Sequence, residues 1–387
     1  MFLFILECPG VGFAGNTGPR QRGSLRSVVF MNKLTVRKVK LALTTDCNLS
    51  CPYCFVEQDE GVMSWGVARD AVDLLLRSAG REKLLSLYGG EPLLCFDLVA
   101  RVVRYARVQA GKTGKILTIN LCTNLLLLDP QMALFFARED VKVIVSVVGL
   151  RRDHDRIRLS ATGVGSYSGV VKNLPLLFEY LPRLNIGAAF CVHPLTVGSL
   201  LINWAHLLEL GFRHVNIEII RDQHGWTERR QSLFAVAMKA IAREVLIRAS
   251  SADPVYLNPV NWEIRNGLLT RPGASWCPFE YFLEVYPRGG VACSPFLHNS
   301  PDIARYQVAV QPARVARPAY CNGQLRPAVC AECRQKYLSA ECSFPGADQV
   351  RREYLRQAVA VARALQSSSR RRDVRRYLDS IRQEVCF

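Results

Sequence analysis

The sequence of 387 residues has no apolar run close to the roughly 20 residues that a membrane-spanning helix needs. Its first residues also lack the basic leader of a signal peptide, and no internal repeat is found. We therefore expect a globular protein with a cytoplasmic location and no membrane partner. A hydrophobic fraction of 49% with 21% charged residues is normal for that class.

Acidic residues are scarce: the sequence has 33 Asp and Glu residues and 50 Lys and Arg residues, which gives a net charge of +17. Residues 1–40 carry +6 of this excess and residues 346–387 carry +5, so the long middle of the chain holds only +6. Charge runs at termini are usually solvated faces or interaction tails. We interpret Arg370 to Arg376 as one face of a terminal helix. This pattern favours attraction to an acidic peptide over binding to nucleic acid.

Cysteine is abundant, and most of the 14 cysteines cluster in residues 47–54 and 277–342. Disulfide frameworks belong mainly to small secreted domains, so the clustering favours metal. Cys47, Cys51 and Cys54 form a Cys-x3-Cys-x2-Cys pattern directly after the apolar run 39–43. A strand would deliver the chain to a loop that presents three thiolates. Three thiolates fit a [4Fe–4S] cluster with one iron left open for a small molecule.

A zinc site or three buried thiols are the alternatives for this first cluster. Zinc usually takes four ligands from paired Cys-x2-Cys groups, and no fourth ligand lies nearby in the sequence. We therefore predict that Cys47, Cys51 and Cys54 ligate an iron–sulfur cluster.

This cysteine spacing resembles the signature of radical SAM enzymes, and Tyr88-Gly89-Gly90-Glu91-Pro92 resembles their GGEP segment. The resemblance implies a reduced [4Fe–4S] cluster that cleaves S-adenosylmethionine and leaves a 5′-deoxyadenosyl radical. An electron donor such as flavodoxin or ferredoxin is then implied as a partner. It also implies that Gly89, Gly90 and Glu91 hold the methionine part of S-adenosylmethionine and that Tyr53 packs beside the adenine. Ordinary core packing is the alternative for Tyr53.

A second stretch, Ser146 to Tyr167, resembles the peptide- and sulfatase-modifying branch of the same family, although Val148 stands where that branch has Asp. A guanidinium can hold a carboxylate with two parallel hydrogen bonds. On this resemblance we assign Ser146, Arg158 and Asn124 to S-adenosylmethionine. The alternatives are a helix cap or an Asp partner for Arg158 and a plain turn residue for Asn124.

No catalytic acid or base is assigned. We interpret His154, His193 and His214 as structural, because a lone His beside a strand usually is. Other thiols within strand or helix patterns are expected to be buried small hydrophobes; these are Cys95, Cys122 and Cys191.

Short apolar runs alternate with helical patterns along the body of the chain. Strands are predicted at 39–44, 83–88, 115–121, 141–147, 186–192 and 214–220. Helices are predicted from Ser64, whose side chain can cap the first of them, and at 96–109, 131–137, 168–180, 198–210 and 228–249. Such alternation builds a parallel α/β sheet, and periodicity leaves a doubly wound sheet and an open barrel as alternatives. The resemblance implies a partial (β/α)6 TIM-type barrel with a wide lateral opening.

The predicted organisation has four parts. Residues 1–35 form a flexible N-terminal arm, with Met31 as an alternative start, and residues 36–250 form the barrel. Residues 251–276 form a linker. Residues 277–387 form a loop-rich, Cys-rich iron–sulfur extension that ends in helices at 347–366 and 370–384.

The second cysteine cluster comprises Cys277, Cys293, Cys321, Cys330, Cys333 and Cys342. It resembles the SPASM extension of radical SAM enzymes, in which a hairpin such as 283–292 precedes a ligand. That resemblance implies one or two auxiliary [4Fe–4S] clusters, whereas a zinc ribbon is the alternative. The spacing after Cys333 departs from the SPASM pattern, and the second cluster would need Cys321 or Cys386 as a ligand.

The resemblance implies an enzyme that modifies a side chain of a peptide or protein by oxidation, thioether formation or carbon–carbon crosslinking. Formylglycine formation of the anaerobic sulfatase-maturase type, a tRNA- or cofactor-modifying radical SAM enzyme, and a non-catalytic iron–sulfur or zinc protein are the alternatives. Only about 35 residues precede the first predicted strand. Leader recognition would therefore need a separate leader-binding protein, unless the substrate is short.

Overall fold

A parallel sheet carries the six predicted strands in sequence order. The computed structural model describes residues 36–54, 56, 61–220, 225–258, 260–261, 264, 282–292, 308–311, 314–315 and 345–383. The N-terminal arm and the second cysteine cluster, with Cys386, lie outside these residues. The strands are β1 (Lys38–Thr44), β2 (Glu82–Gly89), β3 (Ile116–Thr123), β4 (Val141–Ser146), β5 (Ile186–Val192) and β6 (His214–Ile219). Each pairs in parallel with the next.

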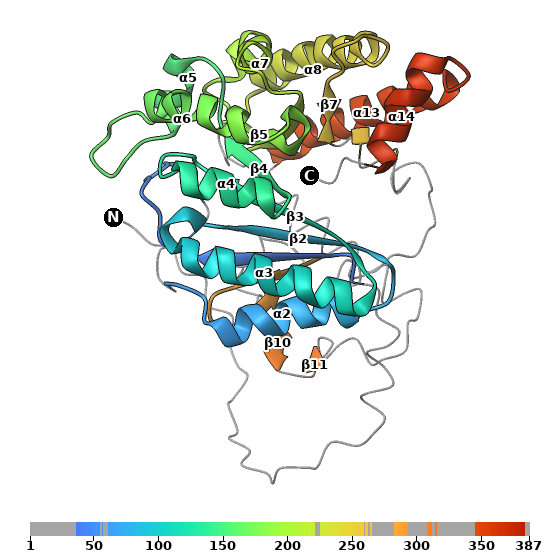
Figure 1. The fold of residues 1–387 in the computed structure, drawn as a ribbon. Coiled ribbons are helices and arrows are strands. Elements are labelled where there is room, and N and C mark those ends of the chain that lie inside the picture. The colour runs from blue at the N-terminus through green and yellow to red at the C-terminus, as the bar shows by residue number, and fades with distance from the viewer. Residues whose placement is uncertain are drawn as a thin grey trace, which may run out of the picture.

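Helices connect these strands and cover the outer side of the sheet (Figure 1). They are α2 (Trp65–Arg77), α3 (Phe96–Thr113), α4 (Pro130–Arg138), α5 (Arg151–Ile157), α6 (Tyr167–Tyr180), α7 (Leu200–Glu209) and α8 (Glu228–Arg248). The predicted cap is present, because the Ser64 side chain accepts a hydrogen bond from Val67 N. Among the α-helices α2 to α8, only the short helix α5 was not predicted from the sequence pattern.

Strands from the later part of the chain extend the sheet at both edges. β7 (Tyr256–Leu257) pairs in parallel with β6, although it lies within the predicted linker. β8 (Phe282–Val285) pairs in parallel with β1, and β9 (Gly290–Ala292), β10 (Val308–Gln311) and β11 (Arg314–Val315) follow antiparallel. The β8–β9 hairpin was predicted from sequence, but its position beside β1 was not. The ends of the described sheet are β11 and β7, so the sheet is a partial barrel.

Two C-terminal helices, α13 (Pro345–Ser367) and α14 (Arg372–Gln383), confirm the helical pattern predicted there. α13 packs along α8 and against β6, at the β7 side of the sheet (Figure 1). Tyr377 of α14 stacks on Tyr256 of β7, and its hydroxyl donates to Val255 O at 2.9 Å. These helices therefore cover the barrel. Among the described residues, no helix combines the length and apolarity needed to cross a bilayer.

The two faces of the sheet differ in polarity because side chains alternate along each strand. On β1, Val39, Leu41 and Leu43 belong to the main apolar core, together with their counterparts on the other strands. The intervening residues of β1 point to the opposite, inner face. This inner face carries polar side chains on β1 to β4 and on β6, whereas β5 presents Gly187, Ala189 and Cys191 there.

Candidate functional site

The cysteine loop follows the end of β1, as predicted. Leu49 N lies 3.4 Å from Cys47 Sγ, and Cys54 N donates to Cys51 O at 3.0 Å, so the loop folds back on itself. Cys47 and Cys51 are half-buried and Cys54 is exposed. The carboxyl ends of parallel strands are where α/β barrels place their chemistry. The loop is therefore at the functional edge of the barrel.

The three thiols influence one another electrostatically. Burial raises the pKa of Cys47 to about 11, with further upward contributions from Glu91, Cys51 and Cys54. Among the described residues, no three His, Cys, Asp or Glu side chains converge as the ligands of one metal ion. A [4Fe–4S] cluster is held differently, because each thiolate binds its own iron. Cys47, Cys51 and Cys54 fit a [4Fe–4S] cluster that has three thiolate ligands. Their role as ligands stays a prediction.

The segment Gly89-Gly90-Glu91 packs its backbone directly against the start of the cysteine loop. Gly90 N donates to Thr44 O at 2.7 Å, and Glu91 N donates to Asp46 O at 2.8 Å. A Cβ on Gly89 would lie 2.1 Å from Thr44 O, and one on Gly90 would lie 2.1 Å from Asp46 O. Glycine is therefore required at both positions by this close approach. Their contact with S-adenosylmethionine stays a prediction.

Glu91 joins the ends of β2 and β3. Its carboxylate is buried and accepts three hydrogen bonds, from Leu93 N at 3.0 Å, Thr123 Oγ1 at 2.7 Å and Asn124 N at 2.7 Å. Burial raises the pKa of Glu91, and the bonds from Asn124, Leu93 and Thr123 oppose this. Glu91 thus positions its neighbours within the chain.

Asn124 connects β3 to the cysteine loop. Its Nδ2 atom donates to Asn48 Oδ1 at 2.7 Å and lies 4.0 Å from Cys47 Sγ. Its Oδ1 atom accepts from Leu126 N at 3.1 Å, and the next residue, Leu125, has a positive φ of 68°. The side chain is therefore fixed beside the predicted cluster.

Arg158 reaches the same loop from the end of α5. Arg158 is the C-cap of α5, as the helix-cap alternative held, because its backbone N donates to His154 O at 2.9 Å. Its guanidinium is used elsewhere, since Nη1 donates to Tyr53 OH at 2.6 Å. Burial raises the pKa of Cys51, and the nearby Arg158 charge opposes this. The Nε atom of Arg158 is buried without a hydrogen-bond partner. A buried unsatisfied donor of this kind fits a carboxylate ligand.

The segment after α5 is tied to the cysteine loop through the backbone. Ser50 N donates to Leu159 O at 2.7 Å, and Ser166 Oγ donates to Arg158 O at 2.9 Å. A Cβ on Gly165 would collide with the Asp155 side chain at 2.1 Å. The Gly163 to Ser166 motif therefore holds Arg158 in place.

Ser146 lies at the end of β4, where its hydroxyl is 3.7 Å from Cys122 Sγ. Among the described residues, the Ser146 hydroxyl contacts this thiol, and no hydrogen bond joins it to the cysteine loop. The structure thus brings together Cys47, Cys51, Tyr53, Glu91, Asn124 and Arg158 through direct contacts or close charges. Ser146 stands apart on the inner face.

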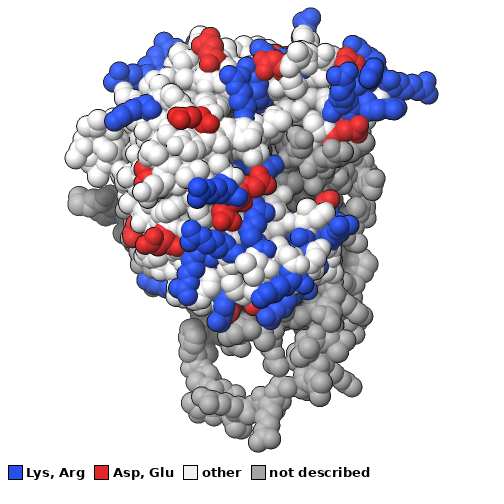
Figure 2. Space-filling view, in the orientation of Figure 1, with Lys and Arg blue, Asp and Glu red and all other residues white. Residues whose placement is uncertain are grey.

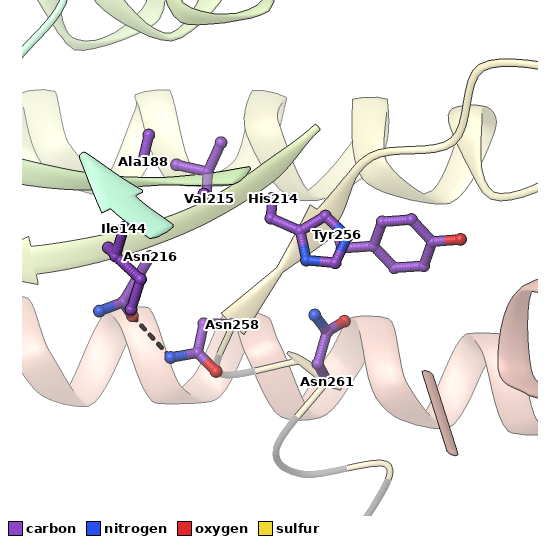
Figure 3. A pocket seen from close by; sticks show the side chains of 9 residues that line it. Ile144, Ala188, His214, Val215, Asn216, Tyr256, Asn258 and Asn261 are labelled. Carbon is purple, nitrogen blue, oxygen red and sulfur yellow. Dashed lines mark hydrogen bonds between the residues drawn. The ribbon is translucent and has the colours of Figure 1, made fainter. Parts of the chain in front are cut away.

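His154 and His214 have structural surroundings, whereas the His193 ring lies 6.3 Å from the Tyr53 ring, so its structural role stays a prediction. His154 is buried, with Nε2 2.9 Å from Ser166 Oγ and Nδ1 3.4 Å from Val148 N, and burial lowers its pKa to about 3. His214 lines a small pocket with Tyr256 and Asn258 at the amino-terminal ends of β5 and β6 (Figure 3). That pocket is at the opposite end of the strands from the cysteine loop, so it is separate from the site.

On the face shown in Figure 2, basic side chains are spread widely and gather at the corner that α14 occupies. Arg372, Arg375 and Arg376 of α14 are exposed, and so are Arg370 and Arg371 just before the helix. Asp373 pairs with Arg371 at 3.0 Å. The predicted basic helix face is therefore present only in part, because Arg370 and Arg371 precede α14, and its partner stays a prediction.

Sequence reasoning missed three contributors to the site. Asn48 and Thr123 fix Asn124 and Glu91, and Lys40 lies on the inner face of β1 opposite Glu284 of β8. Asn48 lies within the cysteine motif and could have been found there. The pairing of Lys40 with Glu284 had no sequence signal, because the two residues are far apart in the chain.

Residues 41–198 match the Radical SAM superfamily model. A cysteine-type anaerobic sulfatase-maturating enzyme of Clostridium perfringens is 29% identical over 152 residues, which are 37% of this chain and 41% of that enzyme. An uncharacterized protein of Methanocaldococcus jannaschii, MJ0907, is 30% identical over 141 residues, or 36% of this chain and 48% of that protein. The matches thus span less than half of these curated relatives.

Two solved structures share the fold. Native anSMEcpe with bound AdoMet and Cp18Cys peptide gives a TM-score of 0.65 at 17% identity, over 86% of this chain and 99% of that one. Streptococcus suis SuiB bound to precursor peptide SuiA gives 0.51 at 12% identity, over 87% and 78%. The fold and the site define a radical SAM domain. Residues 41–198 thus carry a radical SAM domain.

Proposed function

We propose that the protein cleaves S-adenosylmethionine and uses the resulting radical to modify a side chain of a peptide or protein. Oxidation, thioether formation and carbon–carbon crosslinking are the outcomes within this class. The arrangement that carries the proposal is the cysteine loop after β1, held between the Gly89–Glu91 segment and Arg158. Peptide modification is supported by the two similar structures, because anSMEcpe is bound to the Cp18Cys peptide and SuiB is bound to the precursor peptide SuiA.

The first-cluster thiolates of Cys47, Cys51 and Cys54 would hold a [4Fe–4S] cluster, which supplies the electron that cleaves S-adenosylmethionine. Around it, the chain's own residues bind and orient. Arg158 would direct its unpartnered Nε toward the methionine carboxylate, because that atom is buried and has no partner in the described residues. Tyr53 would lie along the adenine while its hydroxyl keeps Arg158 in place.

Gly89, Gly90 and Asn124 would complete the cofactor pocket. The glycines allow the backbone to approach the loop, and Glu91 fixes Asn124 beside Cys47. Ser146, at the end of β4, would be a further contact of S-adenosylmethionine. The Cys-rich extension would hold one or two auxiliary clusters through Cys277, Cys293, Cys321, Cys330, Cys333 and Cys342. A flavodoxin or ferredoxin would supply electrons.

Formylglycine formation is the second candidate, because the Clostridium perfringens relative is a sulfatase-maturating enzyme. The two candidates differ in product.

Purified, anaerobically reconstituted protein is incubated with S-adenosylmethionine, a chemical reductant and synthetic Cys-containing peptides, and the peptide mass is followed. A formylglycine product replaces the thiol with an aldehyde, whereas a crosslink or thioether removes two hydrogens. Reductant-dependent release of 5′-deoxyadenosine supports the proposal, and its absence refutes it.

A further inference from the structure

A row of polar side chains crosses the inner face of the sheet in register. Glu284 of β8 pairs with Lys40 of β1, and Lys40 pairs with Ser86 of β2. Ser86 pairs with Asn120 of β3, which pairs with Lys142 of β4. Residues paired across parallel strands point to the same face. Five adjacent strands therefore place one polar residue each in a single line; we call this line the inner polar row.

The buried carboxylate of Glu284 has no hydrogen-bond partner. Its side chain is 0% exposed, and both of its oxygens are unsatisfied. Lys40 Nζ is 3.9 Å from Glu284 Oε1, which is an electrostatic contact beyond hydrogen-bonding distance. Ser86 Oγ, in the same row, is also buried without a partner. Unsatisfied buried groups are rare in native proteins, and those that persist mark strain or a ligand.

Lys40 is a partly exposed member of the row, whereas Glu284, Ser86 and Asn120 are buried. The Lys40 side chain is 22% exposed, and Nζ lies 3.4 Å from the centre of the Tyr88 ring, directly before Gly89. Lys40 is also four residues before Thr44, where β1 leads into the cysteine loop. At a rise of about 3.3 Å per residue the row is about 13 Å from the end of the strand. The row thus lies on the strands that carry the cofactor motifs, deeper in the barrel.

We propose that the inner polar row is the subsite that selects the substrate, by binding an uncharged, hydrogen-bond-donating group of the peptide beside the residue to be modified. This inference rests on the proposed function. The unpartnered atoms of Glu284 are acceptors, so the ligand group must donate. Lys40 offsets the charge of Glu284, and Lys142 adds a second positive charge to the row, so a further cation would meet like charge, whereas an anion could not donate to Glu284. A side-chain amide or hydroxyl satisfies the row without that conflict.

Such a subsite rejects apolar groups strongly. An apolar side chain in its place would leave Glu284 and Ser86 unsatisfied after water has been excluded. Sites built to hydrogen-bond a substrate group can reject the analogue that lacks it by roughly 10⁴-fold. The row therefore predicts a preference for Ser, Thr, Asn or Gln over Leu or Val at one position of the substrate peptide.

The test compares the wild type with Lys40→Met/Glu284→Leu, which replaces the charged pair by apolar groups of similar size. Lys172→Met, on the exposed surface of α6, is the matched control. Reconstituted proteins receive a mixture of synthetic eight-residue peptides with a central Cys and either Asn, Ser, Leu or Val at each flanking position. We expect the wild type to convert one Asn or Ser peptide at least tenfold faster than its Leu counterpart. The double variant should lose or invert that preference, while the control keeps it.

Thermal unfolding supplies a second readout that needs no substrate. A pair kept for recognition is not optimised for stability, and replacing buried ion pairs with apolar residues is often neutral or stabilising. The double variant should therefore unfold at the same temperature as the wild type or higher. A lower unfolding temperature, or an unchanged peptide preference in the double variant, overturns the proposal. If the wild type converts no peptide at all, the proposed function fails, and the unfolding result still decides the role of the row.

Discussion

The Glu91 carboxylate and the backbone of Asn124 are joined by a hydrogen bond of 2.7 Å that fixes the end of β2 to the end of β3. The same carboxylate holds Thr123 and the 3-10 turn at Leu93. Asn124 in turn contacts Asn48 and Cys47 in the cysteine loop. Glu91 makes no hydrogen bond to a cysteine, but it orients Asn124, which contacts Cys47.

Replacing Glu91 with Gln should therefore weaken S-adenosylmethionine binding. One of the three donors would face an amide NH2, which cannot accept, and an unsatisfied buried group costs about 1–3 kcal/mol. If that cost falls on the bound state, the affinity decreases roughly tenfold or more. Isothermal titration of the reconstituted protein measures this change. Glu179→Gln, on the exposed surface of α6, is the control, and equal affinities for the two variants would show that Glu91 is not needed.

The bond of 2.6 Å between Arg158 and Tyr53 predicts that their effects on cofactor affinity are coupled. Arg158→Lys should reduce S-adenosylmethionine affinity, because an ammonium cannot reproduce the planar guanidinium. Tyr53→Phe should reduce it less, since only the hydroxyl is lost. The double variant should lose less affinity than the two single losses added together. Strict additivity in the titrations would mean that the two residues act independently.

Glu284 predicts a pH dependence of stability. Burial raises its pKa from the ordinary 4.5 to about 7, and Lys40 and Lys38 oppose that rise. Between these two values the folded state binds more protons than the unfolded state, so the free energy of unfolding falls as pH rises from about 4.5 to 7. The contribution of Glu284 is at most about 3 kcal/mol. Denaturant unfolding at pH 5 and pH 7.5 should show a smaller difference for Glu284→Gln than for the wild type; an unchanged difference would contradict the assignment.

Lys83 offers a contrasting variant at the opposite end of the barrel. Its buried ammonium donates to Val36 O at 2.7 Å and to Ser78 Oγ and Ala79 O at 2.6 Å. Lys83→Met should lower the free energy of unfolding by about 1–3 kcal/mol, because these acceptors lose their donor. Cleavage of S-adenosylmethionine per folded molecule should stay the same, since Lys83 is near the start of β2. Reduced cleavage alongside full cofactor binding would show coupling between the two ends.

The second cysteine cluster predicts a product-specific loss. Cys330→Ala/Cys333→Ala should lower the iron content without removing it entirely, because the first cluster keeps its three ligands. Peptide product should be lost, since an auxiliary cluster would accept the electron left on the substrate. Iron analysis and peptide mass spectrometry of one preparation test both parts. Full product from this variant would show that these cysteines do not take part in turnover.

The strands and most helices of the barrel could be predicted from the sequence. Buried parallel strands such as Ile186–Val192 are short apolar runs, and caps such as Ser64 mark helix starts. The cysteine loop and the glycine segment were also predictable, because their spacing is local. Each needs nothing from distant parts of the chain to be recognised.

Contacts between distant segments could not be predicted. The pairing of β8 with β1 joins residues more than 200 positions apart, and Lys40 and Glu284 meet only through it. Likewise, the bond from Arg158 to Tyr53 depends on how α5 returns to the cysteine loop. Periodicity reports the burial of a face but not which strand lies beside it.

The central claim is that Cys47, Cys51 and Cys54 hold the cluster that cleaves S-adenosylmethionine. The direct measurement is iron content and 5′-deoxyadenosine formation in reconstituted wild type and in the triple variant Cys47→Ala/Cys51→Ala/Cys54→Ala. We expect the variant to lose about four irons, as a [4Fe–4S] cluster requires, and to form no 5′-deoxyadenosine. A triple variant that still forms 5′-deoxyadenosine would contradict it.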